Sequence, residues 1–176
     1  MKKHRYLKRI NAVHASLGID RKYGQIHSIP VHMEAKKLVS IGPDIFQREQ
    51  FLAPPAARAW HAMKERASSD EVILQLVSAF RSVHYQEELI RRKLEKGQPV
   101  ADILKVSAAP GYSEHHTGRA LDLTTPGTAV LEEEFEESDA FKWLTAHAGE
   151  FGFRMSFPRG NRHGLAYEPW HWAWRA

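Results

Sequence analysis

Cysteine is absent from the 176-residue sequence. Disulfide bonds and thiolate metal sites are therefore excluded, and a bound metal ion would need nitrogen and oxygen ligands. Cysteine nucleophiles are excluded for the same reason, whereas the redox compartment stays open because such a chain tolerates either environment. The sequence also lacks a His-Glu-x-x-His helix, a Gly-x-Ser-x-Gly turn and a phosphate-binding glycine loop.

Long apolar runs are missing as well. The basic opening stretch, MKKHRYLKRINAVHASLGID, never has seven consecutive apolar residues, so it lacks the core of a secretory signal. No segment is long enough to span a bilayer. We therefore expect a cytoplasmic protein, and action in the periplasm or outside the cell would require another route of release.

Charge is unevenly distributed over a chain whose net charge is +4. Residues 1–24 are strongly basic, and residues 131–139 are strongly acidic. A solvated surface is the simple interpretation of both segments, and an anionic partner is the alternative for the basic one. Because aromatic residues are not interleaved with these basic residues, we expect no nucleic-acid partner.

The chain is long enough, and at 43% hydrophobic residues apolar enough, for one domain with a proper core. Apolar periodicity and turn residues predict helices and strands without a regular alternation. The helices are expected over 54–70, 83–97 and 138–152, and the strands over 24–33, 36–42, 71–80, 119–125, 153–157 and 166–174. This order favours an α+β fold, in which helices flank a central antiparallel sheet.

One pairing of histidine with a carboxylate occurs in the stretch GYSEHHTGRALDLTT, residues 111–125. Gly118 permits a sharp bend, so that His115 could fold back over the following strand, from which Asp122 would project toward it. Metal binding is one interpretation of this pair. The other is that Asp122 caps the backbone or pairs with an arginine, while His115 lies on the surface.

A second pairing lies near the end of the chain, where Glu168 precedes His171 by three residues. Zinc lowers the pKa of a bound water to about 7, and a nearby carboxylate can then take the proton during hydrolysis. The alternative is that Glu168 makes a surface ion pair, while Trp170, Trp172 and Trp174 pack in the core.

Three separated motifs resemble the VanY-type D-alanyl-D-alanine carboxypeptidases, which are zinc peptidases related to Hedgehog-like domains. The motifs are SAFRSVHYQ at 78–86, APGYSEHHTG at 109–118 with the following Ala120 and Asp122, and EPWHW at 168–172. The similarity runs from about residue 52 to 174 and implies the Hedgehog/DD-peptidase-like fold. It divides the chain into a catalytic domain at 51–176 and a basic segment, 1–50, that packs on it or extends it.

The resemblance implies that His115, Asp122 and His171 bind one Zn²⁺ ion. It assigns Glu168 as the base that activates water, and Arg81 as the group that stabilises the oxyanion or holds the carboxyl end of the substrate. These assignments suit the chemistry of a carboxylate and of a fixed guanidinium.

The resemblance further implies that Ser113 and Gln86 contact the substrate. His116 falls on a variable position of the motif, so we expect a neighbour on the rim of the site rather than a ligand. Ala79 and Phe80 stand where the family usually has glycine and tyrosine, which alters the walls near Arg81.

The implied activity is hydrolysis of the bond to a C-terminal D-amino acid, D-Ala above all, in a peptidoglycan-derived peptide. Two alternatives stay open: a phage-type peptidoglycan endopeptidase of the same superfamily, and a non-catalytic zinc-binding interaction domain. We expect a monomer.

Overall fold

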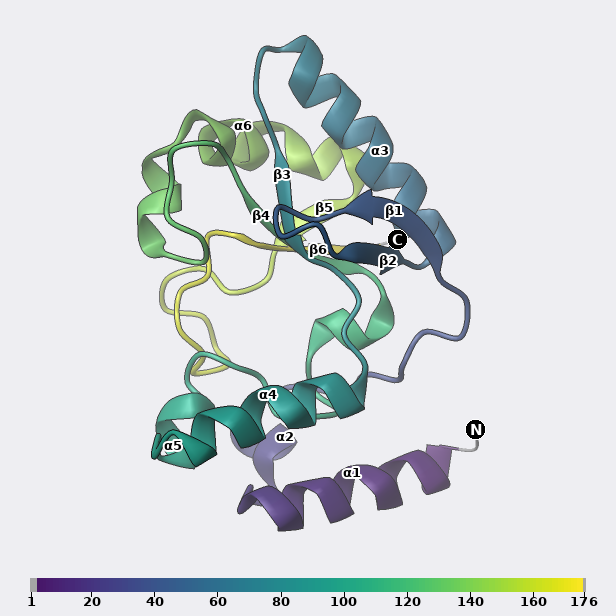
Figure 1. Cartoon of the computed structure of the whole chain (residues 1–176), viewed down its shortest axis with the longest axis vertical. Helices are drawn as coiled ribbons and strands as arrows, with labels where there is room; N and C mark the ends of the chain where they lie inside the picture. The colour runs from purple at the N-terminus through teal and green to yellow at the C-terminus, as the bar shows by residue number, and fades with distance from the viewer. Residues whose placement is uncertain (1–2, 176) are drawn as a thin grey trace.

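A four-stranded antiparallel sheet forms the centre of the computed structural model, which describes residues 3–175 (Figure 1). Its strands, in spatial order, are β3 (Gln75–Ser78), β4 (Ala120–Thr124), β6 (His171–Trp174) and β5 (Phe153–Met155). A separate hairpin is formed by β1 (Val39–Pro43) and β2 (Glu49–Leu52).

The register of the sheet brings distant parts of the chain together. Asp122 on β4 lies opposite Ser78 on β3 and opposite His171 on β6. All five residues of β4 are buried, because it is a central strand with the sheet continuing on both sides. A side chain on β4 can therefore meet side chains from both flanking strands.

Helices gather at two ends of the molecule (Figure 1). Helices α3 and α6 lie next to the sheet, whereas α1, α2, α4 and α5 lie together at the other end. The α-helices are α1 (Lys3–Leu17), α2 (Tyr23–Ile26), α3 (Pro54–Ser69), α4 (Val83–Glu95), α5 (Val100–Ile103) and α6 (Asp139–His147), and the 3₁₀ helices are η1 (Glu114–Thr117), η2 (Glu133–Glu137) and η3 (Ala148–Phe151). No helix within residues 3–175 is both long enough and apolar enough to cross a membrane.

The largest apolar cluster joins α3 and α6 to the sheet. The predicted stripe of α3 supplies four of its buried residues, Ala56, Trp60, Met63 and Ala67. Trp172 belongs to the same cluster, and Trp170 and Trp174 pack against it half-buried, as expected for core tryptophans. A second cluster joins α1 and α2 to α4 and α5.

The predicted α+β fold with an antiparallel sheet is confirmed. The helix expected over 54–70 and the helix that begins after Ser138 are also confirmed, and the Ser138 hydroxyl caps the latter by accepting the Phe141 N–H at 3.1 Å. The strands are shorter than expected. Within the predicted strand 71–80, only the residues of β3 form a strand, and the strand predicted over 36–42 is observed as β1, which begins and ends later in the chain.

The strand expected over 24–33 is wrong. Residues 24–26 belong to α2, and the rest runs as irregular chain whose backbone binds the loop that carries the histidines. The His32 N–H donates to Gly111 O at 2.8 Å, and the Ala35 N–H donates to His116 O at 2.8 Å. These isolated contacts satisfy the polar backbone without a strand ladder.

The strand expected over 166–174 begins only at His171. Pro169 has no N–H to donate to a ladder, and the chain turns there, with the His171 N–H donating to Glu168 O at 3.1 Å. Helix α1 had no counterpart in the sequence prediction. Its buried positions include Tyr6, Ile10 and Leu17, at helical spacing.

Candidate functional site

The three predicted ligands lie together at the end of the sheet. Asp122 comes from β4, His171 from β6 and His115 from η1, and all three side chains are buried. The Asp122 carboxylate lies 3.2 Å from His115 Nε2 and 3.0 Å from His171 Nδ1. One ligand atom from each residue falls within 4.8 Å of the others.

Gly118 holds the turn that returns His115 to the sheet. It ends η1 with φ +63, in the left-handed region that side chains rarely adopt. A Cβ at this position would lie 2.9 Å from Ala53 N and 2.9 Å from Leu38 Cδ2. The loop therefore needs glycine both for its conformation and for the close approach of the chain before α3.

The hydrogen bonds of His115 fix which ring nitrogen faces the cluster. His115 Nδ1 lies 2.5 Å from Ala79 O, and only an N–H can donate to that carbonyl. Burial lowers the pKa of His115 to about 4, so the ring is neutral and its Nε2 lone pair points toward Asp122.

His171 is oriented by a second carboxylate. Its Nε2 lies 3.0 Å from Glu114, which leaves Nδ1 directed at Asp122. Burial by itself lowers the pKa of His171, but the hydrogen bonds to Asp122 and Glu114 outweigh burial and raise that pKa to about 10. A cation bound at Nδ1 would take the place of the proton there.

These residues fit a divalent metal ion such as Zn²⁺. Two imidazole nitrogens and one carboxylate form a ligand set that zinc accepts, and three protein ligands leave a fourth position for water or substrate. The two orienting contacts, from Ala79 O and Glu114, are of the kind that metal-binding histidines make with their other nitrogen.

Glu168 lies beside the cluster, in the turn before β6. Its Oε2 is 3.8 Å from His171 Nδ1, and its side chain is 13% exposed. Burial raises the pKa of Glu168 to about 7, because the charged form loses hydration. This carboxyl group can therefore take up and release a proton near neutral pH.

Arg81 follows β3 and contacts two of the predicted residues. Its guanidinium lies 3.2 Å from Asp122 Oδ2 and 3.4 Å from Gln86 Oε1. Its Nε is buried and has no hydrogen-bond partner among residues 3–175. A buried donor without an acceptor is unfavourable, although the Arg81 side chain as a whole is 20% exposed.

Two cavities meet at these residues. A small one, of about 40 Å³, is lined by Gln86, Ser113, His115 and His171. A larger one, of about 520 Å³, extends past Asp122 and Trp170. Arg81 and Glu168 line both, so all seven predicted site residues border one continuous region.

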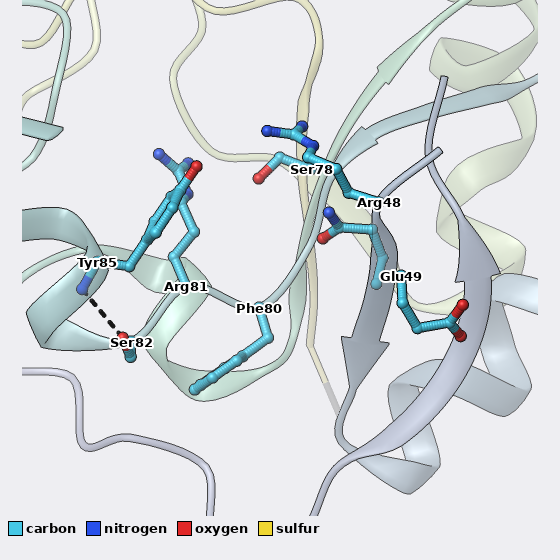
Figure 2. Close-up of a pocket in the computed structure, with 8 residues that line it drawn as sticks. Arg48, Glu49, Ser78, Phe80, Arg81, Ser82 and Tyr85 are labelled. Atoms are coloured by element: carbon cyan, nitrogen blue, oxygen red, sulfur yellow. Dashed lines mark hydrogen bonds between the residues drawn. The ribbon is translucent and has the colours of Figure 1, made fainter. Parts of the chain in front are cut away.

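A further pocket, of about 320 Å³, lies on the other side of Arg81. Figure 2 shows Arg81 and Tyr85 on the α4 side of this pocket, and Arg48 and Glu49 on the side of the β1–β2 hairpin. Phe80 lines this pocket and does not line the two cavities at the cluster. The departure from the motif at Phe80 therefore lies outside the two cavities that border the three predicted ligands.

The sequence predicts that His116 lies on the rim of the site, and this prediction is wrong. His116 does lie outside the ligand cluster, as expected. It is fully buried, and burial lowers its pKa to about 3. Its Nε2 accepts the Gly111 N–H at 3.0 Å, and its Nδ1 donates to Arg81 O at 2.6 Å. His116 thus ties the histidine loop to the backbone of Arg81.

Glu114 is a site residue that the sequence argument missed. Besides His171, it accepts hydrogen bonds from the Ser156 hydroxyl and from Arg175, each at 2.5 Å. Although burial raises the pKa of Glu114, the hydrogen bond from His171 and the neighbouring donors hold it well below its usual range. The only signal in the sequence was its place between Ser113 and His115.

Comparison with known proteins gives one family for most of the chain. The VanY model, described as D-alanyl-D-alanine carboxypeptidase, matches residues 49–176. YodJ of Bacillus subtilis, a candidate carboxypeptidase, is 30% identical over 156 residues, which are 82% of this chain and 55% of that protein. The chain therefore spans about half the length of this relative.

Solved structures agree with the fold. The LD-carboxypeptidase LdcB has a TM-score of 0.73 and 26% identity, with 82% of this chain and 71% of that chain covered. A vancomycin-resistance D,D-pentapeptidase VanY in complex with Zn(II) has a TM-score of 0.63 and 23% identity, with 83% and 82% covered. At 23% identity, the similarity to VanY shows the fold alone.

Proposed function

The chain belongs to the VanY family of D-alanyl-D-alanine carboxypeptidases, and we propose that it hydrolyses the bond to a C-terminal D-amino acid, D-Ala above all, of a peptidoglycan-type peptide. One observation carries the proposal: the carboxyl group of Glu168 lies beside a cluster of three potential ligands, in a cavity that Arg81 also lines.

Each residue has a defined task in this reaction. His115, Asp122 and His171 would hold one Zn²⁺ ion, which would supply a Lewis acid that lowers the pKa of water. Glu168 accepts the proton of the attacking water and passes it to the nitrogen of the breaking C–N bond. The products are the shortened peptide with a new carboxylate and the free amino acid.

Arg81 faces the negative charge of the substrate. Its Nε lacks a partner, and its terminal nitrogens are already held by Asp122 and Gln86, so the guanidinium is fixed before a ligand arrives. Donors that are already fixed need little reorganisation when the transition state forms. The group that the guanidinium faces is either the developing oxyanion or the terminal carboxylate.

Ser113 and Gln86 select the terminal residue. Both are buried and line the small cavity, and the Gln86 amide is held by donating to Ala108 O at 2.8 Å. The cavity measures about 40 Å³, which suits a side chain as small as a methyl group. We therefore expect alanine to be preferred over larger terminal residues.

A second candidate concerns the stereochemistry of the bond. LdcB, named as an LD-carboxypeptidase, has a higher identity and TM-score than the D,D-pentapeptidase VanY. This favours testing an L,D bond, in a tetrapeptide stem, beside the D,D bond of a pentapeptide stem.

The experiment measures free D-Ala released from both stems by the zinc-loaded protein. Glu168→Gln should lower kcat about 10²- to 10⁴-fold, because the amide cannot take a proton. Glu65→Gln, on the exposed side of α3, is the matched control. Retained activity in the Glu168 variant would refute the assigned mechanism, and release of peptide fragments from intact peptidoglycan would favour an endopeptidase. A wild-type protein that binds zinc and cleaves nothing would favour a non-catalytic domain.

A further inference from the structure

The larger cavity contains a cation that the reaction above does not use. Lys93 lies on α4, seven residues after Gln86, and its side chain lines the larger cavity together with Arg81 and Glu168. It does not line the small cavity. Gln86, Leu89 and Lys93 share one face of the helix, and the last two border the larger cavity.

Lys93 has no acidic partner in the described chain. Lysine ion pairs within residues 3–175 are those of Lys105 with Asp102 and of Lys142 with Asp139. The Lys93 ammonium donates instead to the Ser107 hydroxyl at 3.1 Å. Burial and the nearby Arg81 lower the pKa of Lys93, as expected where two cations border one partly enclosed space.

Four carboxylates also border the larger cavity, and they come from different parts of the chain. Asp122 and Glu168 belong to the catalytic region, while Glu132 and Glu133 come from the acidic stretch at η2. Glu133 already pairs with Arg159 at 3.0 Å. Asp122 pairs with Arg81 at 3.2 Å, and none of the four acids pairs with Lys93, so an anion beside Lys93 can form a charge-assisted hydrogen bond with it.

The two cavities give the cleft a direction. The small one takes the side chain of the terminal residue, so the preceding residues of the peptide must lie in the larger one. Seven helical residues separate Gln86 from Lys93 by about 10 Å along the helix axis. An extended peptide advances about 3.3 Å per residue, so Lys93 faces a group about three residues before the terminus.

We propose that Lys93 forms an anion subsite, which binds a free carboxylate carried by the peptide about three residues before its C-terminus. This inference rests on the proposed function, because the direction of the cleft follows from the assigned terminal site. It makes the favoured substrate a peptide with two carboxylates, one at its end and one on a preceding residue.

The test uses two peptides that differ in one group. One carries the free carboxylate on the preceding residue, and the other carries a carboxamide there. We expect the wild type to favour the acid by about tenfold in kcat/KM, and this ratio to fall close to one in Lys93→Met. Lys93→Arg should restore part of the preference, and Lys142→Met, an exposed lysine on α6, should leave the ratio unchanged.

Binding to the Glu168→Gln protein gives a readout that does not depend on turnover. Titration calorimetry should show the same preference for the acid, weakening as salt is added. Equal affinity for acid and amide would overturn the subsite, as would a Lys93→Met variant that loses both peptides equally. If the wild type cleaves neither peptide, the proposed function fails, and the binding ratio still decides the subsite.

Discussion

Replacing Glu114 by alanine should weaken zinc binding by the cluster of His115, Asp122 and His171. Glu114 touches none of the metal-facing atoms, and its carboxylate lies 3.0 Å from His171 Nε2, on the far side of the ring. Its contribution is to keep a proton on Nε2, so that Nδ1 is the nitrogen available to the metal. Without it, a neutral ring can place its proton on Nδ1 and donate to Asp122, which is the wrong form for binding.

The magnitude follows from this tautomer preference and from the contacts that are lost. Outer partners of metal-binding histidines typically contribute 10- to 100-fold in affinity, or about 1.4 to 2.8 kcal/mol. Glu114→Ala also removes the acceptor of the Ser156 hydroxyl, and it leaves Arg175 with the Ser156 oxygen at 3.2 Å as its acceptor. We therefore expect the Kd for zinc to rise by about 10- to 100-fold, and Glu114→Gln, which keeps an acceptor oxygen, to show a smaller rise.

Competition with a chromophoric chelator measures this Kd without reference to activity. Glu133→Ala removes an exposed, ion-paired carboxylate outside the cluster and is the control. A folded Glu114→Ala protein that binds zinc as tightly as the wild type would refute the reasoning. Thermal unfolding of the metal-free proteins separates loss of affinity from loss of structure.

Three further predictions concern the loop, the hairpin and the substrate. Gly118→Ala should lower the free energy of unfolding in urea by about 1–3 kcal/mol, since its Cβ meets Ala53 N in a left-handed conformation. Gly97→Ala has the same backbone conformation with open space around it, so its loss should be about 1 kcal/mol. Although burial raises the pKa of Asp44, hydrogen bonds from an arginine side chain and two backbone N–H groups lower it overall. Its stabilisation is therefore present above the unfolded pKa of about 4 and is lost as pH falls through the lower folded pKa, so the stability difference between wild type and Asp44→Asn should shrink below pH 4. Arg81→Lys should lower kcat/KM about 10- to 100-fold, because a lysine lacks the planar fork of donors that Asp122 and Gln86 hold in place.

Each of these has an outcome that contradicts it. Equal losses in Gly118→Ala and Gly97→Ala would show that the close approach at Gly118 is unimportant. An Asp44→Asn protein whose stability difference from the wild type is the same at pH 3 and pH 7 would exclude a lowered pKa. For Arg81, unchanged kcat/KM with lysine would mean that charge alone is sufficient.

Local pattern predicted the elements that carry their own signal. The prolines at the start of α3 and the apolar stripe along it predict that helix. Both signals lie within the helix itself, so they can be found in a short stretch of sequence. Helix α1 carries a comparable stripe, yet basic residues dominate the segment, and its packing against distant residues is not visible in the sequence. The expected strand over 24–33 failed because backbone contacts to a remote loop replaced a sheet ladder.

The sequence by itself determined the chemistry that is available. It excluded thiolates, and it placed His115, Gly118 and Asp122 at a spacing that lets a loop histidine return to a strand aspartate. It also set Glu168 three residues before His171. These relations hold within short stretches, so that turn geometry and side-chain alternation suffice to read them.

The tertiary structure decided which of these groups meet. Asp122 and His171 are 49 residues apart, and they face one another because β4 pairs with β6 in that register. Only the fold places Glu114 behind His171, buries His116 under Arg81, and lines one cavity with Lys93 and Glu168. The physical reason is that sheet order and helix packing depend on contacts between distant residues, which a local pattern does not specify.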